Sequence, residues 1–177
     1  MRITALLLLL LTAPARGATI DPAHAGLVDQ RGSAFSFAQL RGAPVAVTFV
    51  ATRCKDACPM VNGWFVQLQT RLRRERVNAT LLTITLDPHY DTPRVMAAQA
   101  HALDADSHVW RVASGSVASI DALLAAFHVR VQPDAHGVPD VHSTFVYILD
   151  ARGKIVDVEL PSAAIVDDTM TALRAYR

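Results

Sequence analysis

The chain has 177 residues, of which 51% are hydrophobic and 19% are charged, and its formal net charge is +1. This length and composition predict one globular domain with a substantial buried core. A net charge this close to balance argues against nucleic acid as a partner.

Residues 1–18 have the pattern of an export signal. Arg2 provides the positive start, residues 3–11 are leucine-rich, and residues 12–18 offer small side chains for cleavage. The apolar run is shorter than the roughly 20 residues that span a bilayer. We therefore expect a cleaved signal peptide and a mature domain at residues 19–177 in a bacterial periplasm. Membrane association is expected only through an uncleaved N-terminus or a membrane-bound partner.

The elements that follow alternate between strand and helix patterns. Residues 26–37 predict a hairpin, and residues 38–44 predict a helical turn closed by Gly42. The remaining strands are expected at residues 45–50, 79–86, 108–113, 142–149 and 154–160. The remaining helices are expected at residues 59–76, 93–103, 116–127 and 161–176. Residues 132–140 are loop by composition.

This order is typical of a thioredoxin-like α/β sandwich, with a central mixed sheet flanked by helices and an N-terminal hairpin. Sites in such sheets form at the carboxyl ends of the strands. Cys54 follows the apolar strand 45–50, so it is expected at such an end.

Cys54 and Cys58 are the only cysteines in the chain. Residues four apart lie above one another on a helix face, so the two sulfurs can converge on a metal ion or form a disulfide. A crosslink across so short a loop restrains little of the unfolded chain, which favours a chemical role over a structural one. Pro59 is expected at the first position of the helix, whose positive pole would favour thiolate over thiol.

Two thiolates suit Cu(I) or Zn(II) but leave the metal in need of a third ligand. His142 opens a predicted strand after a long loop, and from the residues alone it can equally be that ligand or an ordinary histidine. The other candidate histidines are expected to be solvated or to serve packing; they are His89, His101, His108, His128 and His136.

Three segments together resemble the signature of the Sco/SenC family. They are Thr52-Arg-Cys-Lys-Asp-Ala-Cys-Pro59, Leu86-Asp-Pro-His-Tyr-Asp-Thr-Pro93 and Val141-His-Ser-Thr-Phe-Val-Tyr-Ile-Leu-Asp-Ala-Arg-Gly-Lys154. The likeness covers roughly residues 26–160. It implies a thioredoxin-like protein that binds one copper ion and assists copper delivery to, or cysteine reduction at, the CuA site of cytochrome c oxidase.

The resemblance also implies roles for individual residues. It carries the copper ligands onto Cys54, Cys58 and His142, and it places Asp87 near the copper, outside the ligand set. His89 is a weaker candidate for an extra ligand. The implied partners are a copper-accepting protein such as an oxidase subunit and an upstream copper donor or thiol reductant. The protein is then a metallochaperone rather than an enzyme.

Three other functions compete with this one. An exported thiol-disulfide oxidoreductase would cycle Cys54 and Cys58 between dithiol and disulfide, but residues 140–144 lack the proline that thioredoxin-type enzymes place opposite their cysteines. A peroxidase would need a threonine-proline-cysteine arrangement, which is absent. A copper store or sensor differs from a chaperone only in whether a partner takes the metal.

Overall fold

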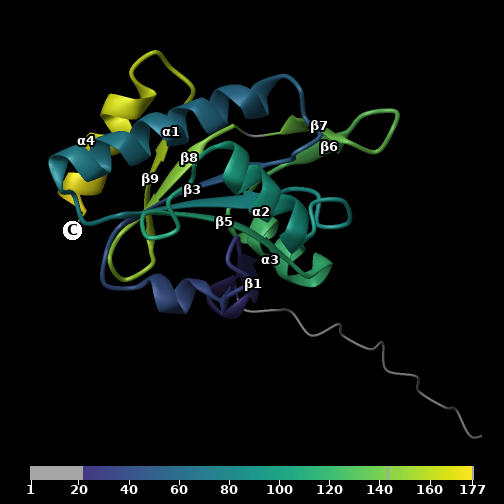
Figure 1. Cartoon of the computed structure of the whole chain (residues 1–177), viewed down its shortest axis with the longest axis horizontal. Helices are drawn as coiled ribbons and strands as arrows, with labels where there is room; N and C mark the ends of the chain where they lie inside the picture. Colours follow the sequence, from purple (N-terminus) through teal and green to yellow (C-terminus); the bar gives the residue numbers. More distant parts are fainter. Residues whose placement is uncertain (1–21, 143, 177) are drawn as a thin grey trace, which may run out of the picture.

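The computed structural model describes residues 22–142 and 144–176, with the backbone alone at residues 140–142. Within these residues, seven strands form one mixed sheet in the order β2-β1-β5-β4-β3-β8-β9, and helices cover both of its faces (Figure 1). The predicted mixed sheet flanked by helices is therefore confirmed. The predicted signal peptide lies outside the described residues.

The elements have the following bounds. The main sheet consists of β1 Leu27–Asp29, β2 Ala34–Phe35, β3 Val45–Val50, β4 Thr80–Thr85, β5 Trp110–Gly115, β8 Val146–Leu149 and β9 Ile155–Glu159. A separate two-stranded sheet pairs β6 Val131–Pro133 with β7 Pro139–His142. The helices are α1 Ala57–Glu75, α2 Pro93–Ala102, α3 Val117–Ala126 and α4 Ile165–Ala175, with 3-10 turns η1 Pro22–His24 and η2 Phe37–Leu40.

The centre of the sheet is parallel and largely buried. β3 runs parallel to β4, which runs parallel to β5, and every residue of β3 is buried. A strand covered on both faces is typically apolar along its whole length, and β3 is apolar except for Thr48. Because parallel strands end at the same edge, residues 51–56 after β3 and residues 86–92 after β4 come together there.

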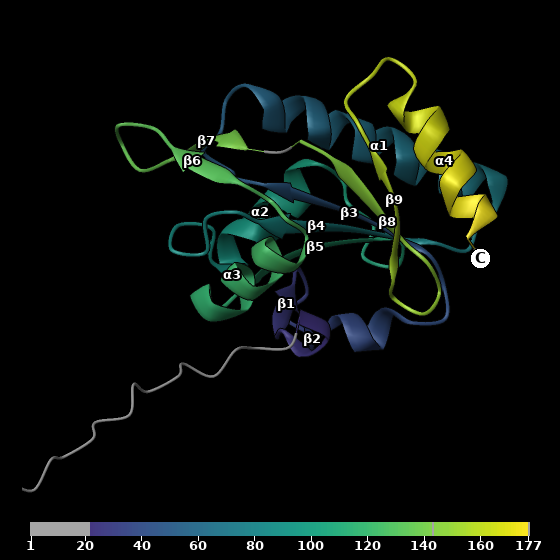
Figure 2. The ribbon, with the colours of Figure 1, turned by 180° about the vertical axis from the view of Figure 1, so that it is seen from behind.

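The chain connections decide which helices share a face. The steps from β3 to β4 and from β4 to β5 move in the same direction across the sheet, so right-handed crossovers place α1 and α2 on one face. α3 leads back across the sheet and lies on the opposite face, while α4 packs beside α1 (Figures 1 and 2). Gln69 of α1 accepts a hydrogen bond from the Asp106 N–H (2.7 Å) and donates one to the Asp104 carbonyl (3.0 Å), which ties α1 to the segment after α2.

Several predictions that depended on local signals are confirmed. β1 and β2 form the expected N-terminal hairpin, whose turn contains Gly32 at a φ of +77°, and β1 extends the main sheet by pairing with β5. α2 begins at Pro93, and the Thr92 hydroxyl accepts a hydrogen bond from the Val95 N–H at 3.4 Å. These features depend on the conformational preferences of a few neighbouring residues.

Two boundaries differ from the prediction in ways that matter for the site. Residues 132–140, expected to be loop, contribute most of the β6–β7 hairpin, and the predicted strand at 142–149 is divided between β7 and β8. The turn of this hairpin is held by the Asp134 carboxylate, which accepts hydrogen bonds from the N–H groups of His136 (2.7 Å) and Val138 (2.8 Å). A turn of this kind shows no hydrophobic periodicity, so the pattern did not predict its flanking strands.

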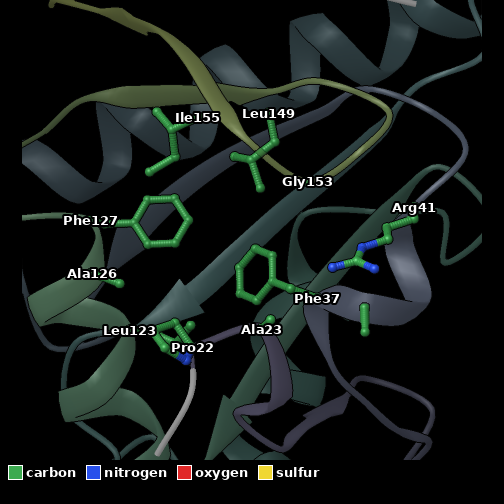
Figure 3. Close-up of a pocket in the computed structure, with 11 residues that line it drawn as sticks. Pro22, Ala23, Phe37, Arg41, Leu123, Ala126, Phe127, Leu149, Gly153 and Ile155 are labelled. Atoms are coloured by element: carbon green, nitrogen blue, oxygen red, sulfur yellow. The ribbon is translucent and has the colours of Figure 1, made fainter.

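A small apolar pocket of about 140 Å³ lies between α3 and the β8–β9 hairpin (Figure 3). The rings of Phe37 and Phe127 border it, with their centroids 5.6 Å apart. Arg41 is the charged residue in its lining, and none of its lining residues is shared with the pocket at the cysteines described below. This pocket belongs to the packing of the N-terminal elements against the sheet.

In the described ranges, no helix is both long enough and apolar enough to cross a bilayer.

Candidate metal centre

The two cysteines flank the start of α1, at the carboxyl end of β3. Cys54 lies in the turn before the helix, and Cys58 is the second helical residue because α1 begins at Ala57, two residues earlier than predicted. The Cys54 N–H donates to the Ala51 carbonyl at 3.1 Å, and the Ala51 N–H donates to the Cys58 Sγ at 3.4 Å. Both cysteines line one pocket, where burial and, to a lesser extent, the neighbouring Cys54 side chain raise the pKa of Cys58. The structure thus places both cysteines at one pocket through the turn before α1. Because Cys54 precedes the helix, the helix-face spacing on which the prediction relied does not apply.

Burial decides the protonation of Cys58. Cys54 is 6% exposed and Cys58 is 2% exposed. Burial raises the pKa of Cys58 to about 12, although the Ala51 N–H that it accepts acts in the opposite direction. The raised pKa favours the thiol at Cys58, contrary to the expected thiolate, because removal from water outweighs the hydrogen bond from Ala51.

A buried carboxylate lies beneath the cysteine turn. Asp91 has no exposed surface, and it accepts hydrogen bonds from the backbone N–H of Thr52 (3.0 Å), from the Thr52 hydroxyl and from the Thr85 hydroxyl (2.8 Å). The Asp91 carbonyl accepts a further bond from the Ser114 hydroxyl at 2.6 Å. Burial raises the pKa of Asp91, and the hydrogen bonds from Thr52 and Thr85 oppose that rise. Asp91 thus ties the segment that carries Cys54 to the ends of β4 and β5.

Asp87 anchors the same turn from its outer side. Its carboxylate accepts a 2.7 Å hydrogen bond from the Arg53 guanidinium, which lies 4.4 Å from the ring centroid of Tyr90. The pKa of Arg53 is raised chiefly by this bond to Asp87. Asp87 is itself held by the Thr85 hydroxyl, which accepts from its N–H at 2.8 Å. The residue before Cys54 is therefore fixed by an ion pair and a cation-π contact.

His142, the predicted third ligand, is the last residue of β7 and not the first residue of a strand in the main sheet. Its backbone pairs with Val131 of β6, and its side chain lies outside the part of the chain that the structure describes. The segment that follows reaches β3, because the Thr48 hydroxyl donates to the Phe145 carbonyl at 3.0 Å. His89 is exposed on the loop after β4. Among the side chains that are described, no group of three histidine, cysteine or carboxylate residues is close enough to hold a metal ion.

The cysteines open onto a surface pocket of about 330 Å³. α1 and the end of α2 form its walls. The lining residues are Ala51, Thr52, Cys54, Cys58, Pro59, Asn62, Gly63, Val66, Gln99 and Leu103. The site therefore combines two buried sulfurs with space for another molecule beside them.

Sequence reasoning placed Cys54, Cys58 and Asp87 at one edge of the sheet but missed Asp91 and the lining of this pocket. The sequence did carry a signal for Asp91. This aspartate directly precedes Thr92, the cap of α2, and so lies at the edge of the sheet where β3 and β4 end. Its burial depends on Thr52, which is 39 positions away in the chain, and no local pattern reports such a contact.

Comparison with known proteins gives matches along most of the chain. The SCO1/SenC family model matches residues 16–176. The SCO2-like protein of Rickettsia felis is 26% identical over 130 residues, which are 72% of this chain but only 63% of the relative. The SCO1 protein homolog of Bacillus subtilis is 24% identical over 130 residues, covering 72% of this chain and 67% of the relative. The chain thus spans somewhat less than two thirds of the Rickettsia relative.

Solved structures show the same fold. Copper-bound ScoI of Bradyrhizobium japonicum superposes with a TM-score of 0.74 at 23% identity, covering 86% of this chain and 96% of that one. Copper-bound Sco1 of yeast gives a TM-score of 0.71 at 23% identity, covering 86% and 87%. These similarities confirm the predicted thioredoxin-like sandwich. Because the family model matches nearly every residue of the chain, the protein belongs to the SCO1/SenC family.

Proposed function

We propose that this protein is an exported copper-binding metallochaperone that passes copper to a copper-enzyme site such as CuA of cytochrome c oxidase. The observation that carries the proposal is the meeting of Cys54 and Cys58 at the carboxyl end of β3, in a pocket that opens at the surface. A metal held by two sulfurs at such an edge can pass to a partner by ligand exchange. Family membership and the copper-bound ScoI and Sco1 structures support copper as the cargo.

The proposed ligands are Cys54, Cys58 and His142. Thiolates are soft ligands that suit Cu(I), and an imidazole completes a three-coordinate site that can also accommodate Cu(II). Both thiols must lose their protons when copper binds, so loading releases protons. Support for His142 comes from the bond between Thr48 and the Phe145 carbonyl, which holds the segment after β7 against β3, the strand that leads to the cysteines.

The test of this ligand set is an anaerobic Cu(I) titration of the reduced protein against a competing chelator. We expect one tightly bound copper ion per chain, and a loss of the native affinity and spectrum in His142→Ala. His136→Ala is the matched control, because His136 is exposed in the β6–β7 turn and should leave the site intact. Native affinity in the His142 variant would exclude the three-ligand site, and no competitive binding by the native protein would exclude the copper function.

Asp87 is proposed to support the copper site from outside the ligand set. Asn at this position cannot form the ion pair with Arg53, so the turn that carries Cys54 should loosen. Loss of such supporting partners typically reduces metal affinity by roughly 10–100-fold. We expect Asp87→Asn to weaken Cu(I) binding by about tenfold in the same chelator competition, with Asp121→Asn on the exposed surface of α3 as the control. Equal affinities in the two variants would contradict this role.

The proposed partners follow from the cargo. A copper-accepting protein such as an oxidase subunit would take the metal, and an upstream copper donor or a thiol reductant would load or reduce the pair. The signal predicted at residues 1–18 supports action outside the cytoplasm, with the periplasm as the proposed location.

A thiol-disulfide oxidoreductase is the second candidate, because Cys54 and Cys58 line the same pocket. A disulfide switch has been identified in the Sco protein BsSco, whose structure has a TM-score of 0.74 with this chain at 20% identity. The two functions separate experimentally. An oxidoreductase would reduce a substrate disulfide with the Cys54–Cys58 dithiol in the absence of copper, whereas a metallochaperone requires copper for its effect on the acceptor.

A further inference from the structure

The pocket beside the cysteines is elongated along α1. Its lining on that helix runs from Cys58 to Val66, which is a rise of about 12 Å at 1.5 Å per residue. Gln99 and Leu103, at the end of α2, form the opposite wall. About four residues of extended chain span this length. The pocket therefore has the dimensions of a short peptide groove that begins at the copper ligands.

Gly63 keeps this groove open. It lies in the middle of α1 with an ordinary helical backbone, so no positive φ requires glycine there. A Cβ at this position would meet no atom within 4 Å beyond its own helix, so close packing within the chain does not require glycine either. Glycine is unfavourable inside a helix. The feature that glycine does provide is a hollow surface one turn beyond Cys58.

The polar groups in the groove suit a peptide backbone. Asn62 and Gln99 contribute carboxamides, and the Asn62 Oδ1 is buried with no hydrogen-bond partner in the described structure. Buried polar atoms normally have partners, so an orphaned acceptor in the lining of a pocket points to a ligand that donates to it. None of the lining residues carries a charge apart from the ionisable cysteines, while Val66 and Leu103 offer apolar contact.

We propose that this groove, formed by Pro59, Asn62, Gly63 and Val66 of α1 with Gln99 and Leu103, binds an extended and uncharged segment of the copper-accepting protein. The proposal rests on the metallochaperone function, because the groove is continuous with the cysteines and would align the acceptor's own ligand with the copper. Asn62 recognises a backbone N–H of the segment. Affinity comes from main-chain hydrogen bonds and one or two apolar side chains, which is a common basis of peptide recognition.

The experiment titrates a capped nonapeptide of uncharged residues with a central methionine into the reduced protein, followed by ¹⁵N NMR. We expect shifts at residues 60–66 and 99–103. Gly63→Phe should weaken peptide binding at least tenfold, and Asn62→Ala at least threefold, because one fills the groove and the other removes the acceptor. Gln67→Phe places the same ring on an exposed position of α1 outside the groove and should change binding less than twofold.

Copper(I) affinity, measured in parallel, separates this proposal from the proposed function. We expect all three variants to stay within threefold of the native affinity. For a native protein that binds copper, two results would reject the groove and leave the copper function standing. In the first, the peptide shifts no groove residue. In the second, the peptide binds Gly63→Phe and Asn62→Ala as tightly as it binds the native protein. If the peptide binds the groove of a protein that binds no copper, the metallochaperone function falls instead.

Discussion

Cys58→Ser is expected to abolish tight copper(I) binding while leaving the protein folded. A serine hydroxyl is a hard ligand that keeps its proton at neutral pH, so the variant retains one thiolate where the proposed site needs two. Loss of a partner outside the ligand set already reduces metal affinity by roughly 10–100-fold, so loss of a ligand should exceed about 100-fold. Chelator competition under anaerobic conditions measures the change.

Cys58→Ala provides a comparison that separates the ligand role from the structural one. The Cys58 Sγ accepts the Ala51 N–H at 3.4 Å, and serine keeps an acceptor there whereas alanine does not. A buried donor left without a partner destabilises a protein by about 1–3 kcal/mol. We expect both variants to lose copper equally and Cys58→Ala to be less stable to urea than Cys58→Ser. Tight copper binding by either variant would contradict the proposed site.

Asp91→Ala is expected to cause the largest loss of stability among the site variants, about 3 kcal/mol in the free energy of unfolding. The substitution removes the acceptor of three hydrogen bonds from Thr52 and Thr85, and it leaves the Thr85 hydroxyl buried and the two Thr52 donors partly buried without this partner. It also opens a cavity below the turn that carries Cys54. Urea unfolding of the reduced protein measures the loss, and Asp121→Ala on the surface of α3 is the control. A change below 1 kcal/mol would show that the Asp91 network does not hold the turn.

Asp91→Asn tests the raised pKa of this carboxyl through the pH dependence of stability. The ordinary value is 3.8, and burial raises the pKa of Asp91 in the folded state. At pH values between the ordinary pKa of the unfolded chain and the raised pKa of the folded state, the folded protein binds more protons than the unfolded chain. Native stability therefore falls as pH rises through this window. Asn does not titrate, so the stability of Asp91→Asn relative to the native protein should increase across the same window. A difference that is constant with pH would contradict the raised pKa.

The sequence by itself determined the features that arise from neighbouring residues. The run Val45–Val50, apolar except for Thr48, predicts a strand buried on both faces, because a strand without a polar side has no face to expose. Thr92 and Pro93 predict the start of α2 through the hydroxyl cap and the fixed φ of proline. The position of Cys54 directly after the Val45–Val50 strand predicts a site at the carboxyl edge of the sheet, where the structure places it.

Only the tertiary structure decided the chemical environment of those residues. Cys58 has a raised pKa because the surrounding chain removes its thiol from water, and this desolvation outweighs the hydrogen bond that it accepts from the Ala51 N–H. Asp91 acquires its role from Thr52, 39 positions away. The groove at Gly63 exists because two crossovers place α1 and α2 on the same face of the sheet. Desolvation and non-local contact depend on which distant segments pack together, and a pattern of neighbouring residues carries no record of that.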